Sequence, residues 1–93
     1  MKALIGDIGN TITKICLIEI NSFKINRIIY FNNKEISSMR FLKKKINIIN
    51  KNKNIYKIAL FSSVVPRYRF LLEKFLKRNY NIQLREIKDK NIK

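Results

Sequence analysis

Three apolar runs, separated by very short polar turns, fill the first third of the chain and most constrain its fold. The runs cover residues 2–8, 13–20 and 23–31, and the breaks lie at residues 9–11 and 21–22. Runs of this length that are rich in Ile, Leu and Tyr favour β-strands, and short links favour antiparallel neighbours. The pattern therefore predicts a three-stranded antiparallel meander. In its first turn, a glycine can take a positive φ and an asparagine tolerates one.

The second run is apolar on both of its alternating faces. Ile15 and Leu17 lie on one face, and Cys16, Ile18 and Ile20 on the other. A strand with two apolar faces is typical of a sheet that helices cover on at least part of each side.

Two helical patterns and two more strands follow the meander. Apolar residues from Ile36 to Ile49 recur at helical spacing, which predicts a helix over about residues 35–49, and residues 50–54 form a polar loop. Residues 56–61 are expected to form a strand. Pro66 suits the first turn of a second helix, which residues 79–81 end. The apolar residues of that helix, at i, i+3, i+4, i+7 and i+8, are Tyr68, Leu71, Leu72, Phe75 and Leu76.

Residues 82–87 alternate weakly and predict a fifth strand, which completes the order β-β-β-α-β-α-β. This order predicts an α/β domain over residues 1–88 with a mixed sheet and flanking helices, followed by a charged tail over residues 89–93.

Composition excludes several classes of site. The chain has one cysteine, Cys16, and no histidine, so it offers no disulfide framework, histidine-based triad or histidine-bearing zinc site. Its apolar runs are shorter than the roughly 20 residues of a membrane-spanning helix. Asp7 follows the start too closely for a signal peptide to form, and we expect a cytoplasmic protein without membrane association.

The formal net charge of +15 is typical of proteins that bind nucleic acid, so nucleic acid is one candidate partner. The chain is also rich in Ile, Lys and Asn, which AT-rich codons favour, and its one dense basic run is residues 43–45. Aromatic residues are not interleaved with the basic ones as on single-strand binding surfaces. We therefore expect that the basic charge results from compositional drift rather than from nucleic-acid binding. The charge by itself does not distinguish the two explanations.

The strongest local signal is the segment Asp7-Ile8-Gly9-Asn10-Thr11 between two apolar strands. A turn of small residues lets a phosphate approach backbone N–H groups, and the Thr11 hydroxyl adds a donor. Thr13, two residues on, is a further phosphate candidate. Asp7 is placed to hold a hydrated Mg²⁺, which prefers oxygen ligands. An ordinary hairpin with a capping aspartate explains these residues equally well. The following lysine, Lys14, is either an exposed strand residue or a phosphate contact.

A second signal lies at Ser62-Ser63-Val64-Val65-Pro66, directly after the fourth predicted strand. On its own this is a strand-to-helix corner. Together, the two segments resemble type III pantothenate kinases, which open with an apolar strand and a D-x-G-N-T/S loop. About fifty residues later they carry S-V-V-P or S-S-V-V-P before an amphipathic helix. Both motifs occur here in that order, at that spacing and on the predicted elements.

The resemblance implies the first domain of the actin-like ATPase (ribonuclease H-like) fold and ATP-dependent phosphorylation of pantothenate, the first step of coenzyme A biosynthesis. It implies ATP, Mg²⁺ and a monovalent cation (K⁺ or NH₄⁺) as cofactors, and a homodimer. Carried onto this chain, Asp7 holds Mg²⁺ through water, Gly9, Asn10 and Thr11 cradle the ATP phosphates, and the corner at Ser62, Ser63, Val64, Val65 and Pro66 shapes the cleft.

The family's second domain, with its G-x-D-R segment, second phosphate loop and general base, has no counterpart in these 93 residues. We therefore expect a fragment, a truncated gene product or half of a split enzyme, which is inactive alone. For a split enzyme, we expect association with a separately encoded second half. Two other functions stay open. One is a basic transcription-accessory or nucleic-acid-binding module of the same family. The other is a different ATPase of the fold, such as a sugar or acetate kinase, which the corner motif disfavours.

Overall fold

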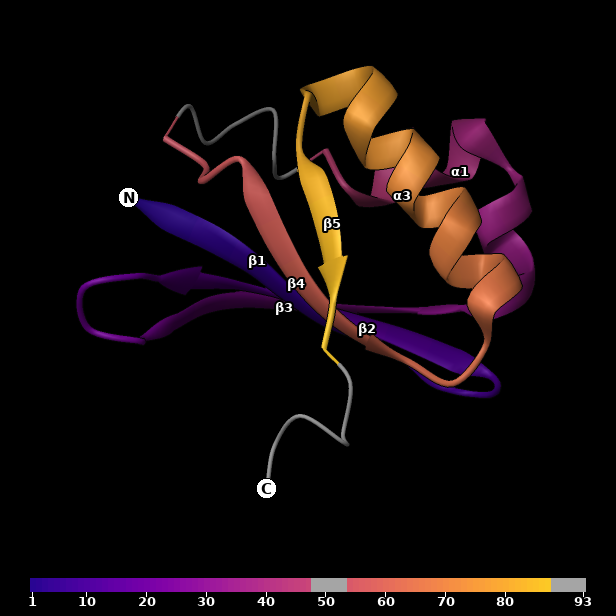
Figure 1. The fold of residues 1–93 in the computed structure, drawn as a ribbon, viewed down its shortest axis with the longest axis horizontal. Helices are drawn as coiled ribbons and strands as arrows, with labels where there is room; N and C mark the ends of the chain where they lie inside the picture. The colour runs from indigo at the N-terminus through magenta and orange to yellow at the C-terminus, as the bar shows by residue number, and fades with distance from the viewer. Residues whose placement is uncertain (48–53, 88–93) are drawn as a thin grey trace.

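The computed structural model describes residues 1–47 and 54–87, in which one five-stranded mixed sheet has the strand order β3-β2-β1-β4-β5 (Figure 1). β1 is central and pairs antiparallel with β2 and parallel with β4. β2 pairs antiparallel with β3, and β4 pairs parallel with β5. The predicted mixed sheet with flanking helices is confirmed.

The predicted meander is formed by β1 (Lys2–Ile8), β2 (Ile12–Glu19) and β3 (Ile25–Asn32). β3 begins two residues later than expected. The Glu19 N–H donates to the Lys24 carbonyl at 2.8 Å, and the Phe23 N–H donates to the Glu19 carbonyl at 2.7 Å. Phe23 takes a left-handed conformation with φ 57° inside this turn. Residues 23 and 24 therefore belong to the turn, although strand propensity alone would assign them to β3.

The first predicted helix is shorter than its apolar pattern. A 3₁₀ segment, η1 (Asn33–Ser37), precedes α1 (Met39–Lys45), and extended backbone at Ser38 separates the two. The Ser38 hydroxyl accepts the Phe41 N–H at 3.2 Å, so this residue caps a new helix instead of continuing the old one. In the predicted stripe Met39 is exposed, while Ile36, Leu42 and Ile46 are buried. Ile49 and most of the expected polar loop lie outside the described residues.

The second half follows the predicted order with small shifts. β4 (Ile58–Ser63) ends two residues later than expected, α3 (Pro66–Tyr80) begins at its proline, and β5 (Gln83–Glu86) lies inside the predicted range. Asn81 ends α3 in a left-handed conformation with φ 57°, which a short amide side chain tolerates.

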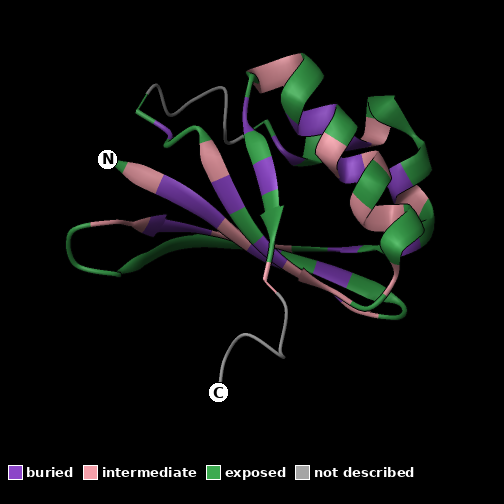
Figure 2. Ribbon diagram, in the orientation of Figure 1, coloured by how far each residue is buried: buried purple, intermediate pink, exposed green. Residues whose placement is uncertain are grey.

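α1 and α3 lie together over one face of the sheet, as Figure 1 shows. A single core joins their apolar faces to the inward side chains of the strands, which Figure 2 shows as buried bands. Ile15 and Leu17 of β2 belong to this core. On the other face of the sheet, Ile28 and Leu60 are each 41% exposed, and no described helix covers them. The expectation of helices on both faces is therefore not met within the described residues.

Gly6 is the point where the sheet and its core come closest. A Cβ built at this position lies 2.2 Å from Phe61 Cε2, and the Phe61 ring is fully buried beside it on β4. The absent side chain of the glycine leaves the space that this ring fills.

We expect Gly6→Ala to lower the free energy of unfolding by about 1–3 kcal/mol, because the added methyl group overpacks a buried site. Phe61→Leu should also destabilise the protein by opening a cavity. The loss of stability in the double variant should be smaller than the sum of the losses in the two single variants. Urea unfolding of the wild type and the three variants checks this. Strict additivity would contradict the close contact.

Candidate functional site

The parallel pairing of β1 with β4 brings the two sequence motifs to one edge of the sheet. Asp7 lies opposite Ser62 and Ile8 opposite Ser63 in this pairing. Beyond the strand ends, the Val64 N–H donates to the Ile8 carbonyl at 3.0 Å. Two segments more than fifty residues apart in sequence are therefore in direct contact.

Asp7 lies at the end of β1, on the face of the sheet that the helices leave uncovered. Its side chain is exposed, and its Oδ1 accepts a hydrogen bond from the Ser62 hydroxyl at 2.7 Å. Lys14 lies opposite Asp7 across the β1–β2 pair and is exposed as well. The hydroxyl favours one orientation of the exposed carboxylate and leaves it further acceptor capacity. This edge therefore presents an oriented negative charge beside a positive one.

The turn after Asp7 is closed from one side by a backbone hydrogen bond. The Gly9 N–H donates to the Ile12 carbonyl at 3.0 Å, and the two residues between them, Asn10 and Thr11, are exposed. Neither glycine has a positive φ, so the predicted reason for Gly9 is wrong. Its small size matters instead, because a Cβ at Gly9 would lie 3.2 Å from the Ile12 carbonyl oxygen.

Thr13 lies beneath the turn rather than on its surface. It is 0% exposed, and its hydroxyl donates to Oδ1 of Asn33 at 2.6 Å. Asn33, at the start of η1, is 2% exposed, and its Nδ2 donates to the Gly9 carbonyl at 2.7 Å. Asn33 was not predicted as a site residue. No local signal marks it, since it follows another asparagine at a strand end, where such residues are common.

The Ser63 side chain stabilises the corner that follows β4. Ser63 Oγ accepts the Val65 N–H and donates to the Val65 carbonyl, both at 3.2 Å. Pro66 then starts α3, and Val64 is 63% exposed at the corner. The predicted corner is therefore present, and it lies directly beside the Asp7 turn.

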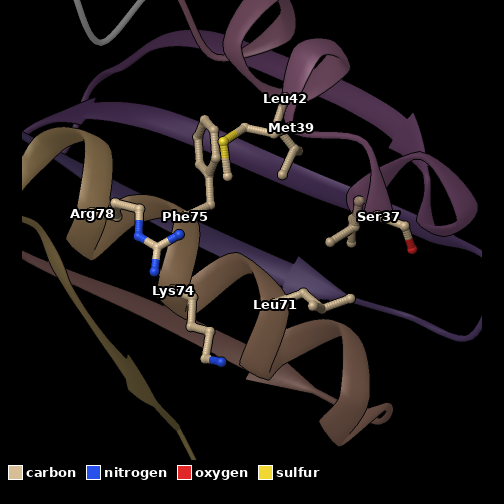
Figure 3. A pocket seen from close by; sticks show the side chains of 8 residues that line it. Ser37, Met39, Leu42, Leu71, Lys74, Phe75 and Arg78 are labelled. Carbon is tan, nitrogen blue, oxygen red and sulfur yellow. The ribbon is translucent and has the colours of Figure 1, made fainter.

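A shallow pocket of about 140 Å³ lies elsewhere, between the first helical segments and α3 (Figure 3). Met39, Leu42 and Phe75 form its apolar wall, and the Lys74 and Arg78 side chains lie along its rim. No residue of the Asp7 turn or of the Ser62 corner lines it. Its volume is below the ~300–1,000 Å³ typical of small-molecule sites, so we do not take it as the functional site.

No described group of three or more His, Cys, Asp or Glu side chains is placed to hold a metal ion. No helix among the described residues has both the length and the apolarity to cross a membrane.

The strand order, the two-motif edge and the helices together define the first domain of the actin-like ATPase fold. Two solved structures share it. A protein of Listeria monocytogenes, provisionally described as an N-acetylmannosamine kinase, matches 92% of this chain and 34% of its own with a TM-score of 0.55 and 14% identity. The Ppx/GppA family member of Aquifex aeolicus matches 98% of this chain and 36% of its own with a TM-score of 0.52 and 15% identity.

The family is more specific than the fold. The model of the type III pantothenate kinase family matches residues 3–93. The type III pantothenate kinase of Pelagibacter ubique (strain HTCC1062) is 39% identical over 89 residues, which cover 96% of this chain. The chain belongs to the type III pantothenate kinase family. It spans 35% of the length of that relative.

The contact between the two motifs can be tested by cross-linking. In a Cys16→Ser background, we expect Asp7→Cys and Ser62→Cys to form a disulfide on mild oxidation, because the two positions face each other in adjacent strands. Asp7→Cys with Ser63→Cys is the matched control, since Ser63 points to the opposite face. Mass spectrometry of peptides from the oxidised proteins reports the link. Equal cross-linking of both pairs would contradict the register.

Proposed function

We propose that this chain is the amino-terminal, phosphate-binding part of an enzyme that transfers a phosphoryl group from ATP to pantothenate. The observation that carries the proposal is the Asp7–Ser62 hydrogen bond, because it joins both family motifs into one surface. Family membership supplies the substrates, since pantothenate kinases act on pantothenate and ATP. In such a transfer, the protein contributes positioning and charge stabilisation rather than covalent chemistry.

Gly9, Asn10 and Thr11 form the surface that would cradle the ATP phosphates. All three are small or short, and Asn10 and Thr11 are exposed. Thr13 was also predicted as a phosphate contact, but its hydroxyl is engaged within the core, so we propose that the exposed turn binds the phosphates without it. Lys14 is exposed on the same face as Asp7, within reach of a phosphate bound at the turn.

Asp7 fits Mg²⁺ as a single carboxylate ligand. Mg²⁺ keeps several waters and is usually held by one or two carboxylates together with substrate phosphates. An exposed carboxylate with a fixed orientation at the end of a strand meets that need. When bound, the ion would neutralise phosphate charge. The resemblance also implies K⁺ or NH₄⁺, for which we assign no residue in the described part of the chain.

The rest of the catalytic machinery is expected in the remaining two-thirds of the enzyme, because this chain spans 35% of its Pelagibacter relative. That part would carry the general base and the residues that select pantothenate. It would be linked to this chain or encoded separately, and the active form would be a homodimer. We propose the cytoplasm as the compartment, as for other enzymes of intermediary metabolism.

We expect the 93-residue chain alone to form no phosphopantothenate. A chimera in which this chain replaces the matching segment of the Pelagibacter relative should phosphorylate pantothenate. In that chimera, Asp7→Asn should lower kcat/KM by about 100-fold or more, because it removes the charge that faces the metal while keeping an acceptor for Ser62.

Glu19→Gln provides the matched control, since it also removes one negative charge but lies at the far end of β2 beside the amino terminus. Its kcat/KM should stay within about twofold of the unmodified chimera. Product formed by the isolated chain and lost in its Asp7→Ala variant would contradict the expected inactivity. Equal losses from both neutralising variants would contradict the role of Asp7.

A further inference from the structure

Only two polar side chains, Thr13 and Asn33, are buried among the described residues, and they contact each other. Burying a polar side chain is costly unless its hydrogen bonds are made. Here they are made behind the turn that carries the family's first motif.

Asn33 holds the turn at two places. Its side-chain Nδ2 donates to the Gly9 carbonyl at 2.7 Å, and its backbone N–H donates to the Thr11 carbonyl at 2.8 Å. The Gly9 carbonyl is the group that would ordinarily accept the Ile12 N–H to close a two-residue hairpin. Asn33 provides this hydrogen bond instead.

The trans geometry of the peptide bond fixes the direction of the N–H group next to each bonded carbonyl. Within one peptide unit, C=O and N–H point in opposite directions. Because the Gly9 carbonyl points to Asn33, the N–H group of Asn10 in the same peptide unit points away from Asn33. A backbone N–H directed away from the supporting residue, in a turn of small residues, is a donor that can bind an anion.

We infer that Asn33 is a positioning residue that holds the Asp7–Thr11 turn in its phosphate-binding conformation through its contacts to the Gly9 and Thr11 carbonyls. The inference rests on the proposed function for the identity of the ligand, a nucleotide phosphate. The contacts that fix the turn are independent of that identity. Asn33 touches no ligand in this arrangement and acts only through the Gly9 and Thr11 carbonyls.

Two variants separate this role from simple core stability. Thr13→Val removes the hydrogen bond between the two buried side chains but leaves Nδ2 bonded to Gly9. Asn33→Asp keeps an acceptor for the Thr13 hydroxyl but replaces the donor to Gly9 with a second acceptor. Thr13→Val loses one buried hydrogen bond. Asn33→Asp loses one and also buries a carboxylate against the Gly9 carbonyl, so both should destabilise the protein, and only Asn33→Asp should release the turn.

The first measurement uses the full 93-residue chain without ligand. Hydrogen exchange followed by NMR reports the protection of the Gly9 amide, which donates to Ile12 across the turn. Relative to the protection of core amides in the same variant, we expect about a tenfold or greater loss in Asn33→Asp and less than about threefold in Thr13→Val. Equal relative losses in the two variants would overturn the inference.

The second measurement uses the chimera described above. Asn33→Asp should raise the KM for ATP about tenfold or more and leave the KM for pantothenate nearly unchanged, while Thr13→Val should change neither beyond about threefold. A purely structural role would shift both constants, or both variants, together. If the unmodified chimera is inactive, the proposed function fails while the exchange experiment still decides the role of Asn33.

A third variant covers the case in which Asn33→Asp does not fold. The double substitution Thr13→Val with Asn33→Leu removes both partners at once and leaves neither side chain with an unsatisfied polar group. It should fold and still show the loss of Gly9 protection, with Thr13→Val alone as its reference. Wild-type protection in the double variant would overturn the inference.

Discussion

The parallel pairing of β1 with β4 is the constraint on which the rest of the structure depends. It makes β1 central, so the strand that ends in Asp7 has neighbours on both sides. It also sets the register that places Ser62 beside Asp7 and leads the Val64 N–H to the Ile8 carbonyl. Without that pairing, the meander would still form a hairpin turn, but the corner at Ser62 and Ser63 would not lie beside it. The site is therefore a property of the sheet rather than of either motif.

The alternation of side chains along β1 and β2 places different residues on the two faces of the sheet at this edge. Asp7 and Lys14 point to the uncovered face, where a charged ligand can reach them. Thr13 points to the covered face, where it meets Asn33 in the core. The uncovered side of the turn thus carries exposed charged residues, and the covered side carries buried hydrogen bonds. Because the period of a strand is two, a shift of one residue in register would exchange these roles.

Much of the fold could be predicted from local patterns. The meander turns, the helix that begins at Pro66 and the order of elements along the chain all depend on residues close in sequence. The break at Ser38 could not, because its side chain offers the backbone a cap that competes almost equally with a continued helix. Asn33 could not either, since its side-chain partners lie 20 and 24 residues away. At the site, the exposed residues were predicted by resemblance, and the buried support was visible only in three dimensions.

The Asp7–Ser62 hydrogen bond also has a bearing on how the chain folds. It spans 55 residues of sequence, whereas the meander closes through turns of a few residues. Closing a long loop costs more chain entropy than closing a short one, and non-local strand pairing is slow for that reason. We therefore expect the hairpins to form early and the two halves of the site to meet late. During synthesis, the turn would leave the ribosome well before the strand that completes it.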